Sequence, residues 1–233
     1  MKILFLTPPM PNWVRWGKKH VACNPLHAHT AAFVREKNVA EVAVLDCRAL
    51  ELDQQQMLER IKDEAPDIVF LGTRLVTDGG AVPVVHNLEA MSILKEFFPK
   101  LVTVFGGLGV SAMPQDIVTL APQVDYLLVG EVEWTLVELL EELKTESPKF
   151  PEIHGLAYRN HGDARLTPPR PLMTELSELP MPAYDLFPMD KYIGFSKLDH
   201  YNEAVTSRGC EGACSFCYEW GLADPRRRRD FFL

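Results

Sequence analysis

The sequence lacks any hydrophobic run that approaches the roughly 20 residues a membrane-spanning helix requires. Its first residues, MKILFLTPP, also lack the long apolar core and the small-residue cleavage site of a signal peptide. We therefore expect neither membrane insertion nor secretion, and we expect the protein to be cytoplasmic.

Cysteine and positive charge are also scarce. Five cysteines in 233 residues are too few for a disulfide scaffold. Because 24 Lys and Arg stand against 32 Asp and Glu, the net charge is -8, which argues against a general nucleic-acid binder. With 47% hydrophobic and 24% charged residues, the composition is that of a folded globular chain. Small molecules are therefore the expected partners.

Five short apolar segments predict β-strands that are buried on both faces, because they do not alternate polar with apolar residues. These segments are residues 2–7, 42–46, 68–72, 101–105 and 126–130. Segments with helical spacing of apolar residues separate them, at 26–37, 53–64, 82–98, 115–120 and 133–143. With right-handed crossovers, this alternation predicts an α/β fold over residues 1–145. The predicted fold is Rossmann-like (flavodoxin-like), with a doubly wound, five-stranded parallel sheet of order 2-1-3-4-5.

A change in composition follows, since eight of the 18 prolines lie between Pro148 and Pro188. We expect residues 146–200 to form a linker, with a small hairpin from 155–158 and 165–167. The proline-rich part after the hairpin is expected to run over the surface without regular structure. Residues 203–206 predict a short strand, and 201–233 are expected to begin a second domain without completing it.

Three cysteines, Cys210, Cys214 and Cys217, form C-x-x-x-C-x-x-C, in which three thiolates can converge on one inorganic centre. Thiolates select iron–sulfur clusters, zinc or cuprous copper. A structural zinc site usually has a fourth ligand, and His200 is the one nearby candidate. The spacing thus favours an iron–sulfur cluster with one iron left open, over zinc or redox-active thiols.

The segment RGCEGACSFC at 208–217 resembles the cluster motif of radical S-adenosylmethionine enzymes. The resemblance implies that Cys210, Cys214 and Cys217 hold a 4Fe-4S cluster whose open iron binds S-adenosylmethionine. An electron from a donor such as flavodoxin or ferredoxin then cleaves the sulfonium and yields a 5'-deoxyadenosyl radical. The resemblance places Phe216 against the adenine, although ordinary packing beneath the loop is an equal alternative. Glu211 stands where relatives often carry proline.

The loops at the carboxyl ends of the predicted strands are the expected ligand sites of an open α/β sheet. Glycine is frequent there, and it allows a ligand to approach the backbone closely, although it also suits tight turns. The candidate residues are Thr73 after the third strand, Gly106 and Gly107 after the fourth, and Gly130, Glu131 and Glu133 after the fifth.

The whole chain resembles the cobalamin-binding class of radical S-adenosylmethionine proteins, in which a Rossmann-like cobalamin domain precedes a partial TIM barrel. Besides the cysteines, the resemblance rests on FGG at 105–107, VDYLLVGEVE at 124–133 and LPMPAYDL at 179–186. It implies that cobalamin rests on the loops that contain Thr73, Gly106, Gly107, Gly130, Glu131 and Glu133. The chain departs from the family pattern at Val132, where relatives often have glycine, and at Leu108 and Gly109, where they have Pro-His.

Histidine ligation of cobalt is not expected, because the sequence contains no D-x-H-x-x-G motif. His20, His27 and His29 lie in or just after the loop that follows the first predicted strand, where histidines are usually solvated.

Together these features predict the N-terminal part of a cobalamin-dependent radical S-adenosylmethionine enzyme, a methyltransferase or related radical enzyme with a small-molecule substrate. The alternative is a non-catalytic module that binds cobalamin or an iron–sulfur cluster. A dinucleotide-binding domain is a weaker alternative. This alternative rests on the pattern G-x-G-x-x-A at 107–112. Pro114 argues against a dinucleotide site, because it delays the start of the helix that should follow the glycines at once. Since most of the barrel would lie beyond Leu233, we expect no turnover by this chain alone.

Overall fold

The structure is a computed structural model that describes residues 1–10, 13–15, 18–73, 82–194, 205, 207–209 and 228–229. The three clustered cysteines, Phe216 and His200 lie outside the described residues, as does most of the predicted strand at 203–206. The structure therefore describes the predicted α/β region and the segment that leads to the cysteine motif.

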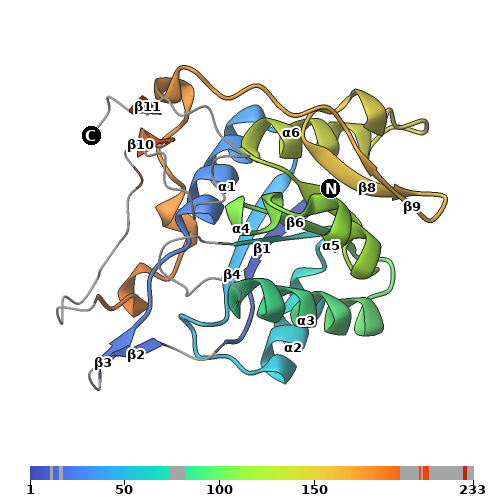
Figure 1. Cartoon of the computed structure of the whole chain (residues 1–233). Coiled ribbons are helices and arrows are strands. Elements are labelled where there is room, and N and C mark those ends of the chain that lie inside the picture. The colour runs from blue at the N-terminus through green and yellow to red at the C-terminus, as the bar shows by residue number, and fades with distance from the viewer. Residues whose placement is uncertain are drawn as a thin grey trace.

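A seven-stranded sheet of order β4-β1-β5-β6-β7-β8-β9 forms the centre of the fold (Figure 1). Its first five strands in this order are parallel, and in chain order they have the arrangement 2-1-3-4-5. They are β1 (Lys2–Thr7), β4 (Glu41–Asp46), β5 (Ile68–Gly72), β6 (Val102–Gly106) and β7 (Tyr126–Leu128). The predicted flavodoxin-like fold is confirmed.

Helices cover both faces of this sheet, which explains why the strands are apolar along their whole length. Ile3 and Phe5 of β1 belong to the core beneath α1 and α6, whereas Leu4 and Leu6 belong to the core on the other face. All four side chains are fully buried. The helices are α1 (Pro25–Lys37) and α6 (Glu133–Glu142) on one face, and α2 (Gln54–Glu64), α3 (Val82–Phe97), α4 (Leu108–Ser111) and α5 (Pro114–Leu120) on the other.

The predicted hairpin forms and extends the sheet. Its strands are β8 (Leu156–Asn160) and β9 (Asp163–Leu166), and β8 pairs antiparallel with β7. Two further pairs of short strands lie outside the main sheet. They are β2 (Trp13–Arg15) with β3 (Lys18–His20), and β10 (Ser207–Arg208) with β11 (Arg228–Arg229).

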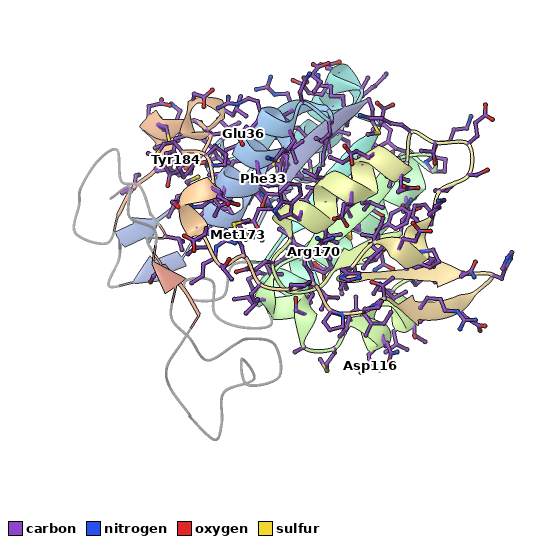
Figure 2. All side chains as sticks on the ribbon, turned by 90° about the horizontal axis from the view of Figure 1, so that it is seen from above. Phe33, Glu36, Asp116, Arg170, Met173 and Tyr184 are labelled. Atoms are coloured by element: carbon purple, nitrogen blue, oxygen red, sulfur yellow. The ribbon has the colours of Figure 1, made fainter. Side chains whose placement is uncertain are left out.

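The proline-rich segment after the hairpin contains only short 3-10 turns, at Leu176–Glu178, Tyr184–Leu186 and Met189–Lys191. The expectation that it runs over the surface is wrong, because apolar residues between the prolines fill the core beside α1 and α6. Leu176 and Ala183 are buried there, and the Ala183 amide donates to the Ala28 carbonyl at 3.0 Å. Figure 2 shows the segment with its labelled residues Arg170, Met173 and Tyr184.

Among the described residues, no helix combines the length and the apolar character that crossing a membrane would require.

Arg159 of β8 joins the hairpin to the end of α5. Its guanidinium donates to the carbonyl oxygens of Val118 at 2.7 Å, Pro122 at 2.8 Å and Ala121 at 3.3 Å. Carbonyls at a helix C-terminus have no partner within the helix, so these bonds satisfy groups that would otherwise lose their hydrogen bonds.

We therefore expect Arg159→Ala to lower the free energy of unfolding by about 2–3 kcal/mol, because several charge-assisted hydrogen bonds are lost at once. Arg165→Ala in β9 is the matched control. Its ion pair with Asp163 is exposed, so its loss is expected to change stability by less than about 0.5 kcal/mol. Urea unfolding of both variants measures the difference, and equal losses would contradict this role of Arg159.

Candidate functional site at the carboxyl edge of the sheet

The strand order reverses between β1 and β5, and ligands of open α/β sheets bind at the carboxyl ends of the strands beside such a point. A small hollow lies at this point, and the polar residues Thr7, Asn24, Arg48 and Asn87 line it. Arg48 and Asn87 are at most 5% exposed. The buried Thr7 hydroxyl has no hydrogen-bond partner among the described residues, which suits a ligand that supplies one.

A larger open groove of about 900 Å³ lies at the opposite edge, at the amino ends of the strands. Its lining includes the apolar residues Ile61, Phe98 and Leu143 and the basic residues Lys62 and Lys100. It brings together no buried polar groups comparable to those beside Thr7. The carboxyl edge, although its hollow is smaller, therefore has the chemistry of a binding site.

Thr73, Gly106 and Gly107 hold the ends of β5 and β6 together. The Thr73 amide donates to the Gly106 carbonyl at 3.0 Å, and the Thr73 hydroxyl accepts from the Gly109 amide at 3.2 Å. Gly107 has a φ of +103°, and a Cβ there would lie 2.7 Å from the Thr73 carbonyl oxygen. Glycine at 107 is therefore required by the protein's own packing, and Thr73 is buried with its hydroxyl bonded to the backbone.

Gly130 differs from Gly107 because nothing lies within 4 Å of a Cβ built on it, although its φ is +79°. Its amide donates to the Ser111 hydroxyl at 2.9 Å, and that hydroxyl donates to the Gly107 carbonyl at 2.9 Å. Ser111 thus connects the loops after β6 and β7, a role that the sequence did not indicate. Among the described residues, nothing fills the space beside Gly130, so a ligand could approach its backbone closely.

Glu131 and Glu133 lie in the loop and the first turn that follow β7, and their carboxylates bind other parts of the protein. Arg208 of β10 donates to both oxygens of Glu133, with an Nη1–Oε2 distance of 3.2 Å. Its Nη1 lies 3.6 Å from Oε1 of Glu131, whose Oε2 accepts from the Met173 amide at 2.8 Å. Glu131 and Glu133, which were predicted to lie in a cobalamin loop, therefore lie at the carboxyl edge of the sheet and pair with Arg208. The sequence assigned no role to Arg208.

The carboxyl group of Glu133 is only 1% exposed. Burial alone would raise its pKa, but the charge and hydrogen bonds of the Arg208 guanidinium outweigh this effect and hold the pKa below its usual range. Glu133 is consequently ionised at neutral pH, and its charge is neutralised inside the protein by Arg208.

His27 and His29 lie on α1 and are buried, so the expectation that they are solvated loop residues is wrong. The ring of His27 packs edge-on against Phe5 and Phe70, with centroid distances of 5.9 and 5.6 Å. His29 lies close enough to Glu133 for its charge to affect that carboxyl group. His20 is in β3, and its side chain is outside the described part of the structure.

The cysteines that the structure describes, Cys23 and Cys47, are free and buried in the α/β region. Burial, with a contribution from the charge of Asp46, raises the pKa of the Cys47 thiol to about 12. Within the described ranges, no group of three or more His, Cys, Asp or Glu residues could hold a metal ion.

The G-x-G-x-x-A pattern at 107–112 does not lead into the long helix of a dinucleotide site. It covers α4, a helix of four residues, and α5 begins only at Pro114. The dinucleotide alternative thus lacks the helix N-terminus that its fingerprint requires.

The sequence is similar to curated proteins of related architecture. Residues 27–140 match the family model of the B12 binding domain. The chain is 34% identical over 222 residues to an uncharacterized methyltransferase, PH0819, of Pyrococcus horikoshii, covering 93% of this chain and 45% of that protein. It is 31% identical over 149 residues to the cobalamin-dependent radical SAM methyltransferase TokK of Streptomyces tokunonensis, covering 63% and 22%.

Solved structures share the fold. The cobalamin-dependent S-adenosylmethionine radical enzyme OxsB, with aqua-cobalamin and S-adenosylmethionine bound, superposes with a TM-score of 0.67 at 20% identity, covering 93% of this chain and 28% of that one. The radical S-adenosylmethionine methyltransferase TsrM of Kitasatospora setae, with cobalamin and a [4Fe-4S] cluster bound, gives 0.64 at 19% identity, covering 98% and 43%. The chain spans less than half the length of each of these relatives. Residues 27–140 thus match the B12 binding domain, and the chain as a whole is similar in sequence and fold to cobalamin-dependent radical S-adenosylmethionine enzymes.

Proposed function

We propose that this chain supplies the cobalamin site and the cluster-binding segment of a radical S-adenosylmethionine enzyme that transfers a methyl group or carries out a related radical reaction. One observation supports this most directly. Arg208, two residues before Cys210, is bound to Glu133 at the carboxyl edge of the B12 binding domain. The segment that precedes the cysteine motif thus lies at the edge where an α/β sheet binds its ligand.

The carboxyl edge has features that fit cobalamin. The Thr7 hydroxyl, which has no partner among the described residues, and the amide of Asn87 can exchange hydrogen bonds with the amide side chains of the corrin or with its nucleotide tail. The space beside Gly130, which no described residue fills, allows a large planar group to approach. Cobalamin would supply cobalt as the carrier of a methyl group or of an electron. Thr73, Gly106 and Gly107 keep the two neighbouring loops in place, and Glu131 and Glu133 hold the following segments.

Cys210, Cys214 and Cys217 are proposed to hold the 4Fe-4S cluster, and Phe216 to contact the adenine of S-adenosylmethionine. The reduced cluster would supply the electron that cleaves the sulfonium, and an electron donor such as flavodoxin or ferredoxin is its proposed partner. We also propose the domain organisation expected from the sequence: a cobalamin-binding domain at 1–145, a linker with the hairpin at 146–200, and the start of the radical S-adenosylmethionine domain at 201–233. We expect turnover to require the regions of the relatives that this chain does not cover.

The substrate is proposed to be a small molecule, and the relatives suggest no single class. They include a 2-(S-pantetheinyl)-carbapenam-3-carboxylate methyltransferase and a cytidylyl-2-hydroxyethylphosphonate methyltransferase. The chain is also 27% identical over 239 residues to the anaerobic magnesium-protoporphyrin IX monomethyl ester cyclase of Rubrivivax gelatinosus, covering 99% of this chain and 40% of that protein.

Gly130→Asn tests the cobalamin site, and Gly162→Asn in the hairpin turn is its matched control. Both glycines have positive φ, +79° and +93°, with nothing within 4 Å of an added Cβ. Asn tolerates such a φ better than other side chains, so each change is expected to lower the free energy of unfolding by about 1 kcal/mol. Only Gly130→Asn is expected to weaken cobalamin binding, by about tenfold or more, because its side chain occupies the edge. Absorbance titration with hydroxocobalamin measures this, and equal affinities of the two variants would refute the placement.

Cys214→Ala tests the cluster. After anaerobic reconstitution with iron and sulfide, we expect this variant to retain no stoichiometric 4Fe-4S cluster, because a ligand is missing. Cys47→Ala should bind the cluster as the wild type does, since Cys47 is buried in the α/β core. Iron and sulfide analysis provides the measurement. A full complement of zinc without iron in the wild type would contradict the proposal.

A further inference from the structure

Arg208 connects the cysteine motif to the B12 binding domain. It is the last residue of β10, and it pairs with Arg228 of β11. In the sequence, residues 210–227, which include all three clustered cysteines, connect the two strands of this pair. In Figure 1, β10 and β11 lie on the left, away from the N-terminus and on the side toward which β1 runs.

Arg208 meets two carboxylates at this edge. Its guanidinium donates to both oxygens of Glu133 and lies 3.6 Å from Glu131. Glu131 also accepts a hydrogen bond from the Met173 amide at 2.8 Å. We call Glu131, Glu133 and Arg208 the charge clamp. It joins the loop after β7, the linker and the strand that precedes the cysteines.

Burial makes the charge clamp specific. The side chain of Glu133 is 1% exposed and that of Arg208 is 18% exposed. A buried carboxylate without a partner is strongly unfavourable, so Glu133 favours the arrangement in which Arg208 is docked. The planar guanidinium, which binds both oxygens of one carboxylate, also fixes the orientation, which the single ammonium of lysine would not do.

Gly209 lets the chain leave the charge clamp abruptly. It has a φ of +82°, a conformation that glycine adopts readily and other residues rarely do. The chain therefore turns at Gly209, directly after the docked Arg208, and Cys210 is the next residue in the sequence.

We propose that Arg208 is a positioning residue, and that the charge clamp holds the cluster-binding segment in one orientation at the carboxyl edge of the B12 binding domain. This inference rests on the proposed function, since it needs a cluster at Cys210, Cys214 and Cys217. It adds that two carboxylates of the first domain, Glu131 and Glu133, act on the cluster segment through Arg208.

The test uses the full-length protein, reconstituted anaerobically with iron, sulfide and cobalamin. Arg208→Lys keeps a positive charge beside Glu133 but loses the bidentate geometry. Arg35→Gln is the matched control. Arg35, in the last turn of α1, also forms a bidentate pair between distant segments, with Asp185, but in an exposed position. Iron per chain and the electron paramagnetic resonance (EPR) spectra of the reduced cluster and of cob(II)alamin are measured for each variant.

We expect Arg208→Lys to bind cobalamin and to assemble a cluster to within about twofold of the wild type. Its reduced-cluster spectrum should broaden, because a loosely held cluster occupies a range of environments. The cob(II)alamin spectrum should stay unchanged, and Arg35→Gln should match the wild type in every measurement. An unchanged cluster spectrum in Arg208→Lys, or equal broadening in Arg35→Gln, would overturn the inference.

A second variant covers the case in which Arg208→Lys does not fold. Glu131→Gln keeps the pair between Arg208 and Glu133 and removes the second negative charge beside Arg208, on a side chain that is 15% exposed. It should broaden the cluster spectrum, and an unchanged cluster spectrum would contradict the inference. Failure of the proposed function itself is distinguishable, because the wild-type protein would then bind neither cobalamin nor a 4Fe-4S cluster.

Discussion

The burial of both faces of the parallel sheet is the constraint on which the other features of this structure depend. Ile3 and Leu4 are neighbours in β1 and both are fully buried, in cores on opposite sides of the sheet. With both faces occupied by helices, only the edges remain available to a ligand. The carboxyl edge differs from the amino edge because polar residues, such as Asn24 and Asn87, converge there without solvent exposure.

The same edge also holds the later segments of the chain in place. Glu131 binds the linker through the Met173 amide, and Glu133 binds the strand that leads to the cysteines through Arg208. The linker in turn is fixed by its own core contacts, such as that of Ala183 with α1. The loop after β7 therefore contacts both later segments, and a cofactor on that loop would lie close to them.

The sequence predicted the elements of the fold well because two-sided burial leaves a local pattern. The segment at 68–72, which is apolar apart from its last glycine, is β5 with the same bounds. The predicted strand at 126–130 is two residues too long, since the last two residues belong to the loop with Gly130. The hairpin was also predictable, because a turn-rich stretch separates its strands.

The contacts of the site were not predictable, because their partners are distant in the sequence. Glu133 and Arg208 are 75 residues apart, and Glu131 and Met173 are 42 apart. Sequence placed both glutamates at the correct edge but could not show that their carboxylates bind protein groups. For the same reason, nothing local indicated that the rings of His27, Phe5 and Phe70 would pack together.

The proposed cluster-binding segment and the proposed cobalamin site meet at the same edge of the first domain. The most direct measurement is EPR on the reconstituted full-length protein, prepared with cob(II)alamin and the reduced cluster in the same sample. The account predicts magnetic interaction between the two spins, seen as splitting or broadening that is absent when either centre is present alone. Two unperturbed spectra that simply add together would contradict it.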